Sequence, residues 1–236
     1  MPKFAAGVVH FQKTVYPAKR DLFERLARGQ SPDALFVACS DSRVETAMIT
    51  QTEPGELFIC RNAGNIVPPY NEQTGGMTAS IEFAMEVLKV PHAVICGHTQ
   101  CGAMAGAMRL DSVAHLPHVS RWLGYARAAV AAVEATGEGL GEEQRMQLLL
   151  EQNVLLQMQH LRTHPAVAAR LARRELVIHG WVYDIATGDV SAFDEAAGRF
   201  VPVEKHYGEE VRRHAAHFAK GQDPDPQTGC GEGSHR

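Results

Sequence analysis

The feature that most constrains the fold of this chain is a set of short apolar runs separated by segments with helical periodicity. Each run has the length of a strand that is buried on both faces. The runs are Leu35–Ala38, Leu57–Cys60, Ala93–Cys96 and Leu176–Tyr183. Because strands that alternate with helices form α/β folds, we expect a mainly parallel central β-sheet flanked by helices.

The segments between and after these runs complete the expected layout. Helical spacing of apolar residues predicts helices over Met77–Leu88 and Met146–Leu161, and the alanine-rich segment Pro117–Ala135 is also predicted to be helical. Thr187–Asp189 has the composition of a hairpin turn, so Val190–Phe193 is predicted to add an antiparallel edge strand. We therefore expect a helical N-terminal arm over residues 1–30, an α/β domain over residues 31–205, and a C-terminal helix with a disordered tail over residues 206–236.

Composition and charge exclude several classes of protein. Of the 236 residues, 45% are hydrophobic, which is enough for a sizeable core, and the formal net charge is −4. A chain with this charge presents no overall basic field, so we expect no nucleic-acid partner. No apolar run is long enough to span a membrane. Five cysteines without an export signal indicate a reducing compartment, so we expect a cytoplasmic protein and leave association with a carboxysome open.

Polar residues follow the carboxyl ends of three predicted strands. Cys39 follows the first strand, Arg61 and Asn62 follow the second, and Gly97 and His98 follow the third. Ligands of open α/β sheets bind along this edge of the sheet. We therefore expect these residues to contribute to one site.

Three of the residues near this edge have the chemistry of zinc ligands. Cys39, His98 and Cys101 offer two sulfurs and one nitrogen, which leaves the fourth tetrahedral position vacant, as in catalytic zinc sites. If His98 and Cys101 open a helix, their spacing places both on one face. The alternative is a group of core thiols with a hydrogen-bonded histidine. Core packing gives no reason for the three polar residues after Cys39, so we favour a metal site.

Asp41 and Arg43 follow the first cysteine closely. A guanidinium group keeps a neighbouring carboxylate ionised and oriented. Asp41 could then accept a proton from a water molecule in the vacant position. This pair adds a candidate catalytic function to the candidate metal site.

The motifs together resemble those of β-class carbonic anhydrases. They are Cys39–Arg43, Arg61–Asn65, Gly97–Gly102 and His179–Trp181. The segments 30–32 and 55–58 resemble the plant-like and cyanobacterial subgroup in particular.

This resemblance implies one Zn²⁺ per chain on Cys39, His98 and Cys101, with Asp41 and Arg43 as the catalytic pair. It also implies a homodimer, or a homotetramer made of two dimers, with N-terminal helices around the second subunit and the site at the interface. Gln30, Phe58 and Gly102 are implied to bind the substrate.

Two departures concern regulation. Phe36 and Ala38 occupy the places of tryptophan and glycine in a subgroup regulated by bicarbonate. In that subgroup the aspartate at the position of Asp41 becomes a zinc ligand in a closed, inactive state. Phenylalanine lacks the indole N–H donor that a buried anion needs. We therefore expect an open resting state at neutral pH, in which Asp41 is paired with Arg43 and is not a zinc ligand.

The resemblance implies reversible hydration of carbon dioxide to bicarbonate and a proton. Two alternatives stay open. The same site could hydrolyse carbonyl sulfide or carbon disulfide, because sequence does not fix the width of the pocket. Alternatively, the protein could bind zinc without catalysis, with Asp41 as a permanent fourth ligand.

Overall fold

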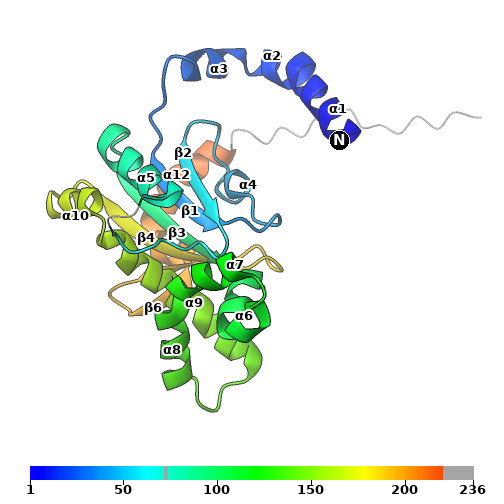
Figure 1. Ribbon diagram of the computed structural model, residues 1–236. Helices are drawn as coiled ribbons and strands as arrows, with labels where there is room; N and C mark the ends of the chain where they lie inside the picture. Colours follow the sequence, from blue (N-terminus) through cyan, green and yellow to red (C-terminus); the bar gives the residue numbers. More distant parts are fainter. Residues whose placement is uncertain (72–73, 220–236) are drawn as a thin grey trace, which may run out of the picture.

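The computed structural model describes residues 1–71 and 74–219 (Figure 1). Its centre is a sheet of six strands in the order β2-β1-β3-β4-β5-β6. The strands are β1 (Ala34–Cys39), β2 (Leu57–Asn62), β3 (His92–His98), β4 (Val177–Tyr183), β5 (Val190–Asp194) and β6 (Arg199–Pro202). The first four strands pair in parallel, and the pairings of β4 with β5 and of β5 with β6 are antiparallel. The predicted α/β class with a mainly parallel sheet is confirmed.

The antiparallel edge differs from the prediction in one respect. Val190–Asp194 forms an antiparallel strand as expected, but β6 lies beyond it and forms the edge of the sheet. The short β6 was missed because it has only four residues, from Arg199 to Pro202, which is too few to show a periodic pattern. A proline at the end of an edge strand removes one backbone donor that could pair with another chain.

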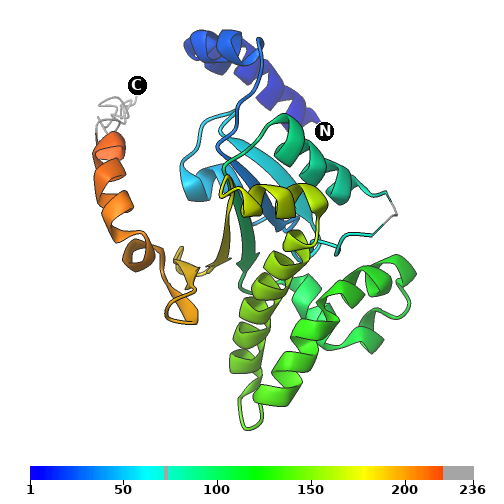
Figure 2. The ribbon, with the colours of Figure 1, turned by 90° about the vertical axis from the view of Figure 1, so that its left-hand side faces the viewer.

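Helices cover the two faces of the sheet unequally (Figure 2). On one face, buried side chains of β1, β3 and β4 pack against three helices, α5 (Gly76–Glu82), α9 (Glu142–Arg162) and α10 (Pro165–Ala172). The α9 helix lies close to the sheet, since a Cβ atom on Gly180 would stand 2.5 Å from Met158 Sδ. On the other face a smaller cluster around Phe36 and Trp181 packs against the segment that contains α4 (Thr46–Thr50).

A third group of buried residues closes the carboxyl end of the parallel strands. It includes residues of α6 (Gly102–Met108), α7 (Pro117–Leu123), α8 (Arg127–Thr136) and α9. The predicted single helix over Pro117–Ala135 is wrong in detail, because a 3₁₀ turn at Gly124–Ala126 divides it into α7 and α8. The division separates α7, which packs against α6, from α8, which packs against α9.

The N-terminal arm is helical, as predicted, and projects from the body of the chain (Figure 1). It comprises α1 (Pro2–His10), a π-helical turn over Phe11–Val15, α2 (Tyr16–Ala18) and α3 (Arg20–Leu26). None of its residues is buried within the chain, and the side chain of Phe4 is 70% exposed. At the other end of the chain, α11 (Val203–His206) and α12 (Gly208–Ala219) follow the sheet. The predicted tail lies outside the described residues.

Within the described residues, no helix combines the length and apolar character that crossing a bilayer requires.

A chain of hydrogen-bonded rings lies on the less covered face of the sheet. His179 Nε2 is 3.2 Å from His92 Nδ1, and His179 Nδ1 is 2.8 Å from the Tyr207 hydroxyl, which accepts a bond from Trp181. Burial, together with the charges of His92 and His206, lowers the pKa of His179 to about 4. His179 is therefore neutral at physiological pH.

This shift predicts a loss of stability in mild acid. Between about pH 6.5 and pH 4, His179 is protonated in the unfolded chain but stays neutral in the folded chain. The free energy of unfolding therefore falls as the pH is lowered through this range. The expected contribution is about 3 kcal/mol. Melting temperatures between pH 7 and pH 4 should decrease less steeply in His179→Gln than in the parent. The exposed His115→Gln should keep the parent's slope, and parallel curves for His179→Gln and the parent would contradict the assignment.

Candidate metal centre

Two neighbouring strands and one helix bring the three candidate ligands together. Cys39 ends β1, His98 ends β3, and Cys101 precedes α6 at its N-cap. Their ligand atoms all lie within 4.8 Å of one another, and the two Sγ atoms are 3.9 Å apart. All three side chains are buried. His98 and Cys101 do not share a helix, which the sequence had left as a condition: His98 ends β3 and Cys101 is the N-cap of α6. The turn between His98 and Cys101 therefore sets the geometry of these two ligands.

The imidazole of His98 is prepared to bind a metal. Its Nδ1 lies 2.8 Å from the Thr99 carbonyl, which requires a proton on Nδ1. Its Nε2 is buried and has no hydrogen-bond partner among the described residues. A buried acceptor without a partner is costly unless a ligand satisfies it. Metal-binding histidines commonly have their other ring nitrogen held in this way. The residues present therefore fit a metal ion beside Nε2.

The two thiols lie within hydrogen-bonding distance of each other where a cation would fit. The Cys101 thiol, with smaller contributions from His98 and the Gly64 amide, lowers the pKa of Cys39 to about 4. The hydrogen bond to Cys39 and burial raise the pKa of Cys101. The pair therefore favours a single negative charge on Cys39, stabilised by the Cys101 thiol. Zinc is suited to this position because it binds thiolate and imidazole ligands.

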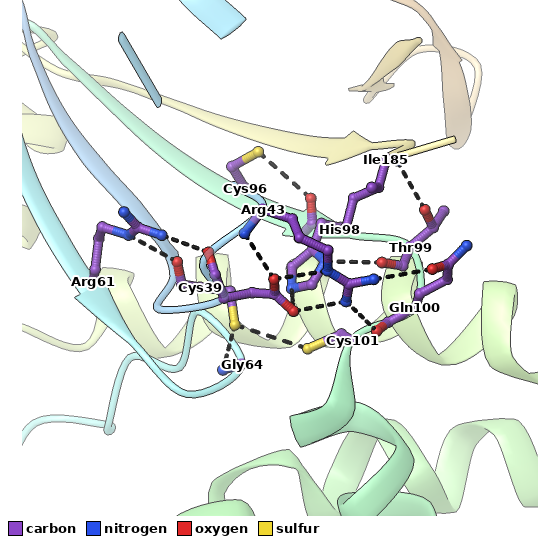
Figure 3. Close-up of polar contacts among 12 residues, drawn as sticks. Cys39, Arg43, Arg61, Gly64, Cys96, His98, Thr99, Gln100, Cys101 and Ile185 are labelled. Atoms are coloured by element: carbon purple, nitrogen blue, oxygen red, sulfur yellow. Dashed lines mark hydrogen bonds and ion pairs between the residues drawn. The ribbon is translucent and has the colours of Figure 1, made fainter. Parts of the chain in front are cut away.

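A loop from β2 supports the first ligand (Figure 3). Gly64 donates its backbone N–H to Cys39 Sγ at 3.3 Å. Gly64 has φ +81°, and a Cβ atom there would lie 2.8 Å from Met104 Cε, so only glycine fits without strain or a shift of Met104. The buried Asn153 of α9 donates its side-chain amide to the Gly64 carbonyl at 3.1 Å. These contacts position the donor that stabilises the Cys39 thiolate.

Asp41 and Arg43 form a bidentate ion pair beside the ligands. Arg43 Nε donates to Asp41 Oδ1 at 2.9 Å, and Nη2 donates to Oδ2 at 2.8 Å. This pairing holds the pKa of Asp41 far below its usual range. Asp41 Oδ2 is also 4.0 Å from the free Nε2 of His98. An ionised carboxylate therefore stands next to the position where a metal and its water would bind.

Arg61 fixes the backbone of the same loop. It donates from Nε to the Cys39 carbonyl at 2.9 Å and from Nη2 to the Asp41 carbonyl at 2.7 Å. The strand end that carries both a candidate ligand and the candidate proton acceptor is thereby held in one conformation.

The three residues expected to bind substrate are placed differently. Gly102 follows Cys101 directly and opens α6. Phe58 pairs with Leu35 in register, whereas Cys39 pairs with Asn62, so Phe58 lies about 13 Å back along the strand. Gln30 is exposed and precedes β1, at the end of that strand opposite Cys39. Within one chain, therefore, only Gly102 adjoins the ligand group.

Sequence reasoning assigned no role to Thr99 or Gln100. The Thr99 carbonyl accepts a hydrogen bond from His98 Nδ1, and Gln100 accepts one from Arg43. Their position in the sequence, between the candidate ligands His98 and Cys101, could have indicated that they lie in the site.

Fold and geometry together define a class of site: a Cys₂His metal centre at the carboxyl edge of a parallel sheet, with an ionised carboxylate held beside it by arginine. Comparisons with known proteins agree. A family model described as "Carbonic anhydrase" matches residues 34–190. A carbonic anhydrase of Pseudomonas aeruginosa is 48% identical over 200 residues, which are 85% of this chain and 90% of that protein.

Solved structures specify the class further. The β-carbonic anhydrase CcaA has a TM-score of 0.83 and 41% identity, covering 86% of this chain and 91% of its own. A chain from a study of two tetrameric β-carbonic anhydrases of Sordaria macrospora has a TM-score of 0.71 and 29% identity, covering 85% of this chain and 100% of its own. The chain belongs to the carbonic anhydrase family and, within it, to the β class, as the motifs predicted.

Proposed function

We propose that this protein is a zinc-dependent carbonic anhydrase, a lyase that catalyses the reversible hydration of carbon dioxide to bicarbonate and a proton. The observation that carries the proposal is the buried, unpartnered Nε2 of His98. It faces two cysteine sulfurs and lies 4.0 Å from a carboxylate held by Arg43. Family membership supports the same reaction.

The residues of the chain would act in distinct ways. Cys39, His98 and Cys101 would hold the zinc ion. Zinc in such a site lowers the pKa of bound water, so that hydroxide is available near neutral pH. Asp41 is ionised and can only accept at its oxygens, so it would orient the attacking O–H group and take up its hydrogen bond. Arg43 would keep Asp41 in that position and prevent it from becoming a ligand.

The substrate-binding residues support an oligomer. We assign substrate contacts to Gln30, Phe58 and Gly102, but in one chain Gln30 and Phe58 lie at the far end of the strands. They can reach a site only if a second copy brings them to it. The exposed helical arm gives such a copy a surface to pack on. A homodimer or homotetramer is therefore proposed, and two relatives from Sordaria macrospora are tetrameric.

The two other functions are less well supported. A permanently closed, non-catalytic site requires Asp41 on the metal, whereas its oxygens are bonded to Arg43 at 2.8 and 2.9 Å. Hydrolysis of carbonyl sulfide or carbon disulfide would use the same ligands, and no described contact favours these larger substrates. A cytoplasmic location is proposed because the four described cysteines are free.

The test is zinc analysis of the purified protein together with stopped-flow hydration of carbon dioxide from pH 6.5 to 9. We expect about one zinc ion per chain and hydration that depends on it. Carbonyl sulfide and carbon disulfide are assayed in parallel. Zinc without hydration would support the non-catalytic alternative, and preferential turnover of a sulfur compound would support the hydrolase.

A further inference from the structure

Gln100 has an unusual backbone conformation in the turn between His98 and Cys101. Its φ is +57°, in the left-handed region, which is unfavourable for residues other than glycine. Its side chain is exposed, so burial does not account for it. Glycine would form the same turn at lower energetic cost. A glutamine here therefore indicates a contribution from the side chain itself.

That side chain contacts Arg43 (Figure 3). Arg43 Nη1 donates to Gln100 Oε1 at 3.0 Å, and Nη2 donates to the Gln100 carbonyl at 3.1 Å. Nε and the second hydrogen of Nη2 donate to the Asp41 carboxylate. All three guanidinium nitrogens are thus engaged, with Asp41 on one edge and Gln100 on the other. Among the described residues, no other side chain bonds this guanidinium.

We propose that Gln100 is a positioning residue that fixes Arg43, and through it Asp41, relative to the metal ligands; this inference rests on the proposed function. Arg43 is 45% exposed, so two bonds to Asp41 alone would leave it free to move with that carboxylate. Gln100 belongs to the turn that joins His98 to Cys101. Its two contacts therefore tie the ion pair directly to the segment that carries two of the ligands.

The chain offers a closely matched control. Gln51 is also an exposed glutamine in the left-handed region, with φ +53°, at the C-cap of α4. In the described part of the chain, its side chain hydrogen-bonds only the Met48 carbonyl of its own helix. Gln100→Gly and Gln51→Gly therefore make the same chemical change and relieve the same backbone strain. Only Gln100→Gly removes a side-chain contact with Arg43.

The experiment measures kcat, KM and zinc content of the zinc-loaded parent and both variants. Loss of a hydrogen bond to a charged group that orients a reacting group should lower kcat and kcat/KM together by about 10- to 100-fold in Gln100→Gly. KM and zinc content should be unchanged. Gln51→Gly should match the parent in every respect.

A second measurement is independent of turnover. Hydrogen exchange of the Arg43 Nε–H, followed by NMR on protein labelled with ¹⁵N-arginine, should be faster in Gln100→Gly and unchanged in Gln51→Gly. Unchanged kinetics and exchange in Gln100→Gly would overturn the proposal. So would a raised KM at constant kcat, which indicates a substrate contact, or loss of zinc, which indicates a role in the metal turn. An inactive parent would refute the proposed function instead.

Discussion

Replacing Cys101 with alanine is expected to reduce bound zinc from about one ion per chain to a small fraction of that, and hydration of carbon dioxide to background. Cys101 Sγ lies 3.9 Å from Cys39 Sγ in a buried site. Without it only one thiolate and one imidazole remain, fewer than the three protein ligands typical of catalytic zinc. Metal analysis of the purified variant and stopped-flow kinetics measure both effects.

Cys96→Ala provides the control. Cys96 is also a buried thiol, and it lies on β3 two residues before His98. Among the described residues its sulfur hydrogen-bonds only the neighbouring Gly97 carbonyl, and burial raises its pKa to about 12, so it does not form a thiolate. Zinc content and activity should match those of the parent. Full zinc occupancy in Cys101→Ala would remove Cys101 from the ligand set.

Asp41→Asn is expected to keep zinc and lose about 10²–10⁴-fold in hydration activity, the range of a positioned general base. Asparagine has nearly the same shape but lacks the charge that Arg43 stabilises. Its amide also places a donor where one carboxylate oxygen accepts. Because Asp41 is bonded to Arg43 and is not required to hold the metal, metal analysis should give the parent's value.

The exposed Asp111 serves as the control, since Asp111→Asn makes the same change away from the site. It should leave kcat and zinc unchanged. Parental activity in Asp41→Asn would show that another group handles the proton. Loss of zinc in Asp41→Asn would instead show that the carboxylate is a ligand.

Local patterns were sufficient where one side-chain periodicity extended over a whole element. The apolar runs predicted four parallel strands within one to two residues of their ends, because both faces of these strands are covered or partly covered. The pattern failed where tertiary contacts break a local signal. The alanine-rich composition of Pro117–Ala135 does not reveal the 3₁₀ turn at Gly124–Ala126, which separates α7 from α8.

For the site, the sequence alone determined the chemistry: two thiols, an imidazole, and a carboxylate two residues before a guanidinium. These assignments depend on residue type and on the rule that the carboxyl ends of parallel strands meet at one edge. Only the tertiary structure decided that His98 ends a strand with a free Nε2, that Gln100 bonds Arg43, and that Gln30 and Phe58 lie far from the ligands of their own chain. The physical reason is that such contacts depend on hydrogen-bond directions and strand register, which are set when separate segments pack together.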